Sequence, residues 1–289
     1  MSWFFLSLTC AILTATTATL SKVLLQKRDE FFVGWIRFAV SLPLLFVVLS
    51  VSKAGCCLSC DFWKVVAITF PLELVAFLLF LKALKFSPLS LTFPFLGLTP
   101  VFTILSSFII LKEKVSLLGA AGILLVTLGA YLLNANTIKE GVLQPIKSIY
   151  REKGSMLMVL VAFIYGTTSV FGKKAVLLSN PITFSVVYCS LFFVLLALPA
   201  LAKYRKTRRR LGKQEALLAL GLGISFAMAI MLHFKAISIV NVSYMISVKR
   251  LSLIISVLYG ALVFGEKHIR CRILGSAVMV GGVLLLSLA

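Results

Sequence analysis

The chain has 289 residues, of which 61% are hydrophobic and 13% are charged. A soluble domain usually carries about 25% charged residues, so this composition excludes an ordinary soluble protein and indicates a membrane protein. The net charge of +20 would suggest nucleic-acid binding in a soluble chain. In a membrane protein the cations first indicate which loops face the cytoplasm, so we expect no nucleic-acid partner.

Apolar runs long enough for membrane-spanning helices, about 20 residues each, occur at ten places along the chain. In chain order they are residues 3–21, 31–51, 62–81, 89–111, 115–133, 155–172, 181–202, 215–234, 239–264 and 271–288. The longest polar connection, residues 134–154, is too short for a soluble catalytic domain. The sequence therefore predicts an all-α integral membrane protein with ten transmembrane helices.

The connections between these spans alternate between the two faces of the membrane. Those on one face hold 19 lysines and arginines, and those on the other face hold 7. The positive-inside rule makes the first face cytoplasmic, with both termini outside. The basic run "KYRKTRRRLGK" at residues 203–213 then lies in the cytoplasm. We expect a multi-pass protein of the cell membrane, either a plasma or an inner membrane.

The two halves of the chain resemble each other. "FLKALKFSPLSLT" aligns with "HFKAISIVNVSYM" without a gap, and Gly129 aligns with Gly282, both at an offset of 153 residues. Near the start of each half the offset is 151. We expect a first repeat over residues 1–138, a connection over 139–154 and a second repeat over 155–289.

Each predicted repeat holds five spans. Because five is odd, the second repeat must enter the membrane from the side opposite to the first, so the two repeats are inverted. Secondary transporters use inverted repeats to build a central site that opens alternately to either side. The topology therefore predicts two inverted five-helix repeats around a central cavity that serves transport.

The same segments carry a family resemblance. "FLKALKFSPLSLTFPFLGLTPVFTILSSFIILKEKVSLLGAAGILLVTLGAYLL" and its echo ending "LVFGEKHIRCRILGSAVMVGGVLLL" resemble the two EamA-type repeats of the drug/metabolite transporter superfamily. The specific elements are the Glu-Lys after spans 4 and 9, the glycine-spaced spans 5 and 10, and Arg37 in "GWIRFAV". The resemblance implies ten helices around a cavity lined mainly by spans 1, 3, 4, 6, 8 and 9, which exports or exchanges small metabolites.

Two adjacent cations, Lys249 and Arg250, lie within the apolar run "YMISVKRLSLIISV". At 1.5 Å per residue they are roughly 14 to 15 Å deep, close to the bilayer midplane. Each costs roughly 2.5–3.5 kcal/mol there, so the pair must face a cavity or a partner. A similar pair in span 9 is a feature of the related phosphate translocators, where it resembles an anion-binding site. We expect both residues to bind substrate.

Glu73, in "FPLELVAF", is the only acid inside a predicted span and lies roughly 16 Å deep. It forms either a structural ion pair with one of the two cations or part of a substrate site. Because two cations exceed one acid, we favour the substrate site. Tyr165 and Thr168, in "YGTTSVFGKK", add hydroxyl groups to span 6 and complete the candidate binding residues. His233 is expected to be an ordinary interfacial histidine.

Two further patterns favour structural roles. Gly122 and Gly129, like Gly275 and Gly282, are seven residues apart and share one helix face. Spans 5 and 10 should therefore pack closely, on each other or on a second copy of the chain.

The Glu-Lys pairs beginning at Glu113 and Glu266 stop apolar runs and should snorkel to water or pair with a neighbouring loop. Arg37, about six residues into span 2, is also interpreted as structural and could snorkel.

Metal and cofactor chemistry finds little support. "CCLSC" at residues 56–60 holds a lone CxxC without a second ligand pair, and we expect no metal and no cofactor. Neither a nucleotide-binding loop nor an HExxH or GxSxG motif is present.

The predicted function is a secondary transporter, an exporter or exchanger of a small polar metabolite that is anionic or zwitterionic, working by alternating access and not as an enzyme. The alternatives are a flippase for a lipid-linked substrate, an accessory subunit, or a membrane-embedded enzyme subunit. The expected partners are the small-molecule substrate and the lipid bilayer, with the protein a monomer or a homodimer.

Overall fold

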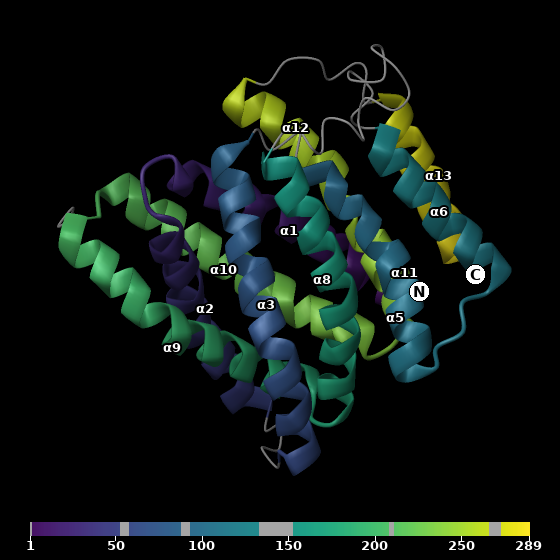
Figure 1. Cartoon of the computed structure of the whole chain (residues 1–289), viewed down its shortest axis with the longest axis horizontal. Coiled ribbons are helices and arrows are strands. Elements are labelled where there is room, and N and C mark those ends of the chain that lie inside the picture. Colours follow the sequence, from purple (N-terminus) through teal and green to yellow (C-terminus); the bar gives the residue numbers. More distant parts are fainter. Residues whose placement is uncertain (1, 53–57, 88–92, 133–152, 208–210, 266–272) are drawn as a thin grey trace.

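The computed structural model describes residues 2–52, 58–87, 93–132, 153–207, 211–265 and 273–289. Within these residues every regular element is helical, as the apolar runs predict (Figure 1). The elements are α1 (Ser2–Leu25), α2 (Glu30–Ser52), α3 (Cys60–Phe86), η1 (Phe93–Leu98), α5 (Thr99–Leu111), α6 (Leu117–Leu132), α8 (Lys153–Leu177), α9 (Pro181–Thr207), α10 (Lys213–Ile237), α11 (Val242–Lys249), α12 (Ser252–Phe264) and α13 (Ile273–Ser287).

Seven helical segments of the described chain are long and apolar enough to cross a membrane: α1, α2, α3, α8, α9, α10 and the segment Val242–Phe264. The other three expected spans correspond to shorter apolar helices, Phe95–Leu111, Leu117–Leu132 and Leu274–Ser287. The chain is thus a multi-pass helical membrane protein, whereas the count of ten spans stays a prediction.

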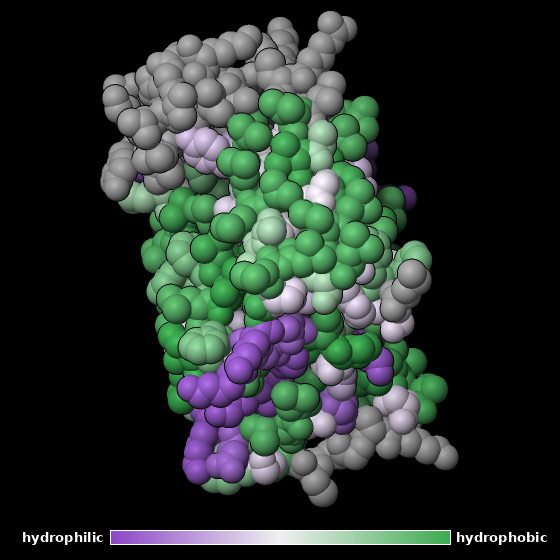
Figure 2. Space-filling view, turned by 90° about the vertical axis from the view of Figure 1, so that its right-hand side faces the viewer, coloured by the Kyte–Doolittle hydropathy of each residue, from purple (hydrophilic) through white to green (hydrophobic). Residues whose placement is uncertain are grey.

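The outer surface of the helices is apolar. Figure 2 shows hydrophobic side chains covering the middle of one face, with a hydrophilic group toward one end. On α6 and α13, Leu124, Leu128, Val280 and Leu284 are all exposed. Soluble proteins rarely expose apolar patches of such extent. This apolar exterior agrees with a protein embedded in a membrane.

Helices of the first half pack against helices of the second half. The main partners are α1 with α10, α3 with α8, α2 with α9, and α6 with α13. The starts of α1 and α8, and of α2 and α9, differ by 151 residues, and the starts of α3 and α10, and of α5 and α12, differ by 153. These are the offsets of the sequence similarity. The pairings α1–α10 and α3–α8 are therefore equivalent to each other, as a pseudo-two-fold axis requires.

The glycines of spans 5 and 10 bring α6 and α13 into close contact with each other. A Cβ atom placed on Gly122 would lie 2.8 Å from the backbone oxygen of Gly282, and one on Gly129 would lie 2.7 Å from the backbone oxygen of Gly275. Only glycine allows two backbones to approach this closely. The expected packing of these two spans on each other is confirmed.

Gly282→Ala should destabilise the protein by about 1–3 kcal/mol, the usual cost of overpacking. A Cβ atom at this position would lie 2.7 Å from the Gly122 oxygen and 2.7 Å from the Val126 nitrogen, both backbone atoms that cannot move alone. The neighbouring Gly281 is a matched control, because a Cβ atom there has no described atom within 4 Å. Thermal unfolding in detergent should show a lower melting temperature for Gly282→Ala than for Gly281→Ala. Equal melting temperatures would contradict the tight interface.

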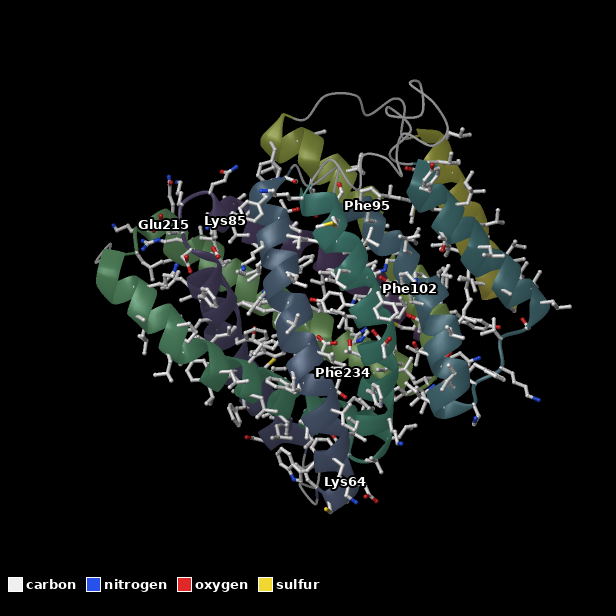
Figure 3. All side chains as sticks on the ribbon, viewed as in Figure 1. Lys64, Lys85, Phe95, Phe102, Glu215 and Phe234 are labelled. Carbon is white, nitrogen blue, oxygen red and sulfur yellow. The ribbon has the colours of Figure 1, made fainter. Side chains whose placement is uncertain are left out.

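Ion pairs connect the loops expected on the cation-rich face. Arg28, between α1 and α2, pairs with Glu215 at the start of α10 at 2.6 Å, and Lys85 at the end of α3 pairs with Glu30 at 2.6 Å. Figure 3 shows Lys85 and Glu215 near one end of the molecule and Lys64, from the start of α3, at the other end. The connections 1–2, 3–4 and 7–8 thus meet on one face, and that this face is cytoplasmic stays a prediction.

A second network joins the connections on the opposite face. Glu113 accepts a hydrogen bond from the Lys173 ammonium at 2.6 Å and another from the backbone nitrogen of Val242 at 3.1 Å. Lys173 also donates to the backbone oxygen of Val240 at 2.8 Å. Glu113 therefore ties α8 to the start of α11, in line with its expected structural role. Its repeat equivalent, Glu266, lies outside the described residues.

Candidate functional site

As regular α-helices, the expected spans 89–111 and 239–264 are both interrupted near their middles. In the described part of the first span, η1 gives way to α5 at Thr99; in the second, α11 ends at Lys249 and α12 begins at Ser252. Thr99 and Ser252 are 153 residues apart and are therefore repeat equivalents. Within a membrane protein, interrupted helices are tolerated where they are buried in protein or line a cavity.

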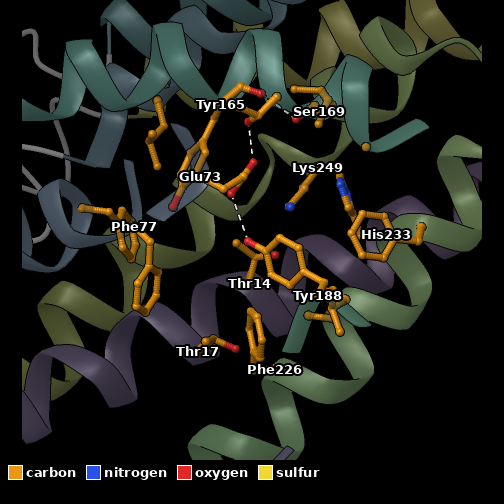
Figure 4. Close-up of a pocket in the computed structure, with 18 of the residues that line it drawn as sticks. Thr14, Thr17, Glu73, Phe77, Tyr165, Ser169, Tyr188, Phe226, His233 and Lys249 are labelled. Carbon is orange, nitrogen blue, oxygen red and sulfur yellow. Dashed lines mark hydrogen bonds between the residues drawn. The ribbon is translucent and has the colours of Figure 1, made fainter. Parts of the chain in front are cut away.

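A cavity of about 170 Å³ lies beside these interruptions (Figure 4). Its walls come from α1, α2, α3, η1, α8, α9, α10 and α11. Spans 2 and 7 thus contribute as well as the spans that the family resemblance implies. Seven phenylalanines and two tyrosines line the cavity, so aromatic side chains form a large part of its wall, alongside ten polar or charged side chains.

All five predicted site residues line this one cavity. Glu73 comes from α3, Tyr165 and Thr168 come from α8, and Lys249 and Arg250 come from the end of α11. Thr168 and Arg250 are buried, while Glu73, Tyr165 and Lys249 are partly exposed. The structure therefore brings together residues that are up to 177 positions apart in the sequence. The similar depths expected for Glu73 and the cations agree with this arrangement.

The carboxylate of Glu73 is held by hydroxyl groups. It accepts hydrogen bonds from Thr168 Oγ1 and, at 2.9 Å, from the Tyr188 hydroxyl. Among the described residues it has no cationic nitrogen within 4.0 Å, so the suggested direct ion pair with Lys249 or Arg250 is not formed. Hydrogen bonds to an ionised acceptor are the strong ones, and two of them partly offset the cost of a carboxylate at this depth.

The two adjacent cations retain donor capacity. Figure 4 shows Lys249 pointing into the cavity toward Glu73, and its ammonium group has no hydrogen-bond partner within the described chain. The side chain of Arg250 is 4% exposed, and its Nε atom is buried without a partner among the described residues. Buried donors without partners are costly. These two side chains are therefore the natural attachment points for an anionic ligand.

Arg37 is a third cation at the cavity. Its Nη2 atom donates to the Ser21 hydroxyl at 2.7 Å, and its guanidinium lies 4.9 Å and 5.1 Å from the ring centres of Phe77 and Phe226. Cation–π contacts of this kind stabilise a desolvated guanidinium. These contacts agree with the structural role expected for Arg37. It lines the cavity, however, and does not snorkel to the surface.

Sequence reasoning missed Tyr188 and misplaced His233. Tyr188 lies 151 positions after Arg37, at the repeat-equivalent position, and this offset could have identified it. His233 was expected at the interface but lines the cavity, where its Nδ1 atom is buried without a described partner. No sequence signal pointed to that placement.

The charges at the cavity do not balance. Arg37, Lys249 and Arg250 are the cations among its lining residues, and Glu73 is the only acid among them. With histidine neutral the cavity carries two surplus positive charges. Uncompensated charge in a site of low dielectric interacts strongly with an incoming anion. The geometry can therefore bind an anionic group while presenting aromatic walls to the rest of a ligand.

Comparison with known proteins places the chain in a family. The model of the EamA-like transporter family matches residues 1–135 and 152–288, nearly the whole sequence. The chain belongs to the EamA-like transporter family. The family is part of the drug/metabolite transporter superfamily, so the resemblance inferred from the sequence is confirmed.

A solved structure shows the same fold. One matching crystal structure, described only as that of a protein, superposes with a TM-score of 0.73 over 100% of this chain and 99% of its own, at 18% sequence identity. At such low identity the likeness concerns the fold alone. The search of curated proteins found no match.

Family membership establishes this EamA-like protein as a membrane transporter, which implies a small-molecule substrate, and the family is not an enzymatic one. Of the residues in the cysteine cluster, Cys60 is a free, exposed thiol, while Cys56 and Cys57 lie outside the described residues. The described part of the chain contains no group of three histidine, cysteine or acidic residues that could hold a metal.

Proposed function

We propose that this EamA-like protein is a secondary transporter that moves a small anionic or zwitterionic metabolite by alternating access. The substrate occupies the central cavity, where its anionic group binds Lys249 and Arg250. Tyr165 and Thr168 complete the polar part of the site, and the aromatic walls contact the remainder of the molecule. Transport runs as export or as exchange.

The observation that carries this proposal is the state of Lys249. Its ammonium group enters the cavity without a hydrogen-bond partner in the described chain, although an acid, Glu73, lies nearby and is held by Thr168 and Tyr188. A cation needed only for structure would pair with that acid, because an unpaired charge at this depth costs several kcal/mol. A substrate anion supplies the missing partner.

The helix arrangement supports alternating access. In this proposal ten spans form two inverted repeats, residues 1–138 and 155–289, joined by residues 139–154. Helix α1 packs on α10 in the way that its repeat equivalent α8 packs on α3, and an inverted repeat produces such equivalent pairings. The two interrupted spans lie beside the cavity, where a change in their angle could open either side. The Glu113–Lys173 pair then holds one face closed.

Uptake into proteoliposomes tests the function directly. Purified protein is reconstituted and offered a radiolabelled panel of phosphates, carboxylates and amino acids, with protein-free liposomes as the control. We expect saturable uptake of at least one anionic or zwitterionic member, and acceleration of this uptake when the same compound is loaded inside. Uptake restricted to cationic compounds, or scrambling of labelled lipids without uptake, would contradict the proposal.

A further inference from the structure

We propose that Glu73 is the proton-coupling group of this transporter, so that each anion crosses the membrane together with one proton carried on the Glu73 carboxylate. The protein is then a proton–anion symporter. This inference rests on the proposed function and adds the coupling ion and its site. It stands on the position and the hydrogen bonds of the one acid that lines the cavity.

Glu73 connects the two halves of the molecule. It belongs to α3 of the first half, and its two hydrogen-bond donors, Thr168 and Tyr188, belong to α8 and α9 of the second half. Alternating access requires the two halves to move relative to each other. When a group forms hydrogen bonds between the two halves at the cavity, a change in its charge state therefore changes the relative stability of the conformations.

The strength of this connection depends on the proton. While Glu73 is ionised, both hydroxyl groups donate to a charged acceptor, and such hydrogen bonds are roughly twice as strong as neutral ones. When Glu73 binds a proton, these bonds become neutral, and the new carboxyl hydrogen must itself find an acceptor. Protonation thus weakens the contact between α3 and the pair α8 and α9, which favours rearrangement of the two halves.

The charged surroundings link the proton to the anion. Lys249 points toward Glu73 inside the cavity, and the ionised carboxylate is part of the field that an incoming anion meets. Binding an anion to Lys249 and Arg250 adds negative charge beside Glu73 and so favours its protonation; by reciprocity, protonation of Glu73 favours anion binding. The titratable and charged groups that face this cavity from the surrounding helices are Arg37, Tyr165, Tyr188, His233, Lys249 and Arg250.

The proton balance of one cycle is simple. A proton from the solution on one side adds to the Glu73 carboxylate as the anion binds. The neutral carboxyl and the bound anion cross with the change of access, and the carboxyl releases its proton on the other side as the anion leaves. The empty protein returns with Glu73 ionised and bonded again to Thr168 and Tyr188.

A different role for Glu73 predicts different behaviour. If its carboxylate bound the ammonium group of a zwitterionic substrate, then Glu73→Gln would weaken substrate binding at every pH, and substrate binding would take up no proton. If Glu73 couples protons, the neutral glutamine mimics the protonated state, so anion binding is retained and its dependence on pH disappears.

The experiment compares wild type with Glu73→Gln, and with Asp61→Asn as a control that removes an exposed acid from the same helix. Proton uptake is measured with a pH indicator when inorganic phosphate or benzoate is added to purified protein, and the carboxyl band is followed by infrared difference spectroscopy. Proteoliposomes then report accumulation driven by a pH gradient and exchange without one.

We expect wild type and Asp61→Asn to take up about one proton for each bound anion. Both should also accumulate the anion when protons flow down a pH gradient in the same direction. Glu73→Gln should lose both the proton uptake and the gradient-driven accumulation, and its affinity for the anion should no longer depend on pH. Anion binding to wild type without proton uptake overturns the coupling and leaves the anion site intact.

Failure of the anion site itself gives a separate result. If neither phosphate nor benzoate binds to wild type, the proposed anion site is contradicted for these probes, and the infrared titration then decides the role of Glu73. A carboxyl band that appears on acidification in wild type and is absent in Glu73→Gln supports proton binding at Glu73. A Glu73 that stays ionised from alkaline to acidic pH overturns the coupling whatever the anion.

Discussion

Lys249→Gln and Arg250→Gln should each weaken binding of the transported anion at least about tenfold, or about 1.4 kcal/mol, while the protein stays folded. Both side chains line the cavity, and neither forms an ion pair with Glu73. Removing either cation therefore takes one positive charge away from the binding site. It does not leave Glu73 without an ion-pair partner, because no such pair exists in the described part of the chain. Affinity is measured by titrating detergent-purified protein with the anion identified in the transport assay.

The conservative change Arg250→Lys separates charge from shape. Lysine keeps the positive charge but lacks the planar fork with which arginine grips a carboxylate or phosphate in bidentate fashion. We expect a loss of affinity intermediate between wild type and Arg250→Gln. Arg250→Lys with wild-type affinity would show that only the charge matters.

A lysine outside the cavity controls for nonspecific effects of charge. Lys235, at the end of α10, is exposed and does not line the cavity. Lys235→Gln should therefore bind and transport like wild type. If all three glutamine variants fold and keep wild-type affinity, Lys249 and Arg250 have a structural role and the proposed anion site is wrong.

Glu215→Gln should cause the largest loss of stability among the single substitutions considered, about 3–5 kcal/mol. Glu215 and Arg28 form an ion pair at 2.6 Å in which the two side chains are 6% and 5% exposed. The substitution removes the negative charge that Glu215 places beside this buried guanidinium. It also removes the carboxylate that accepts from the backbone nitrogen of Gly212 at the start of α10.

The exposed pair of Asp61 and Lys64 supplies the matched control for this prediction. Its two atoms are 2.9 Å apart, but its side chains are 70% and 68% exposed, respectively. Solvent screens such a pair, and its contribution to stability is small. Thermal unfolding should therefore show a melting temperature several degrees lower for Glu215→Gln and close to wild type for Asp61→Asn. Similar melting temperatures for both variants would contradict the importance of burial.

The two interrupted spans show how far the local sequence can predict a break in a helix. In the first, Gly97 and Pro100 flank the junction between η1 and α5, and such residues commonly interrupt helices. In the second, the residues from Lys249 to Ser252 include neither glycine nor proline, yet α11 ends and α12 begins there. Local propensity favours a continuous helix at this point, so the packing of the surrounding helices determines the second break.

Some of the site residues could also be predicted from the local sequence, and others could not. The depth and the cost of charge led from the sequence to Lys249, Arg250 and Glu73, because an apolar run makes any charged residue conspicuous. Tyr188 and His233 are not conspicuous, since tyrosine and histidine are ordinary near a membrane interface. Their positions at the cavity depend on how α9 and α10 turn toward it.

By itself the sequence determined the membrane class, the internal duplication, the family and the candidate charges, because these depend on composition and on spacing along one chain. The tertiary structure decided which groups meet: that Glu73 bonds to Thr168 and Tyr188, and that Lys249 is left facing the cavity. The physical reason is that a hydrogen bond requires approach to about 3 Å and a suitable direction. Equal depth in the membrane brings two residues to the same level, but only the packing of α3, α8, α9 and α11 sets which of them touch.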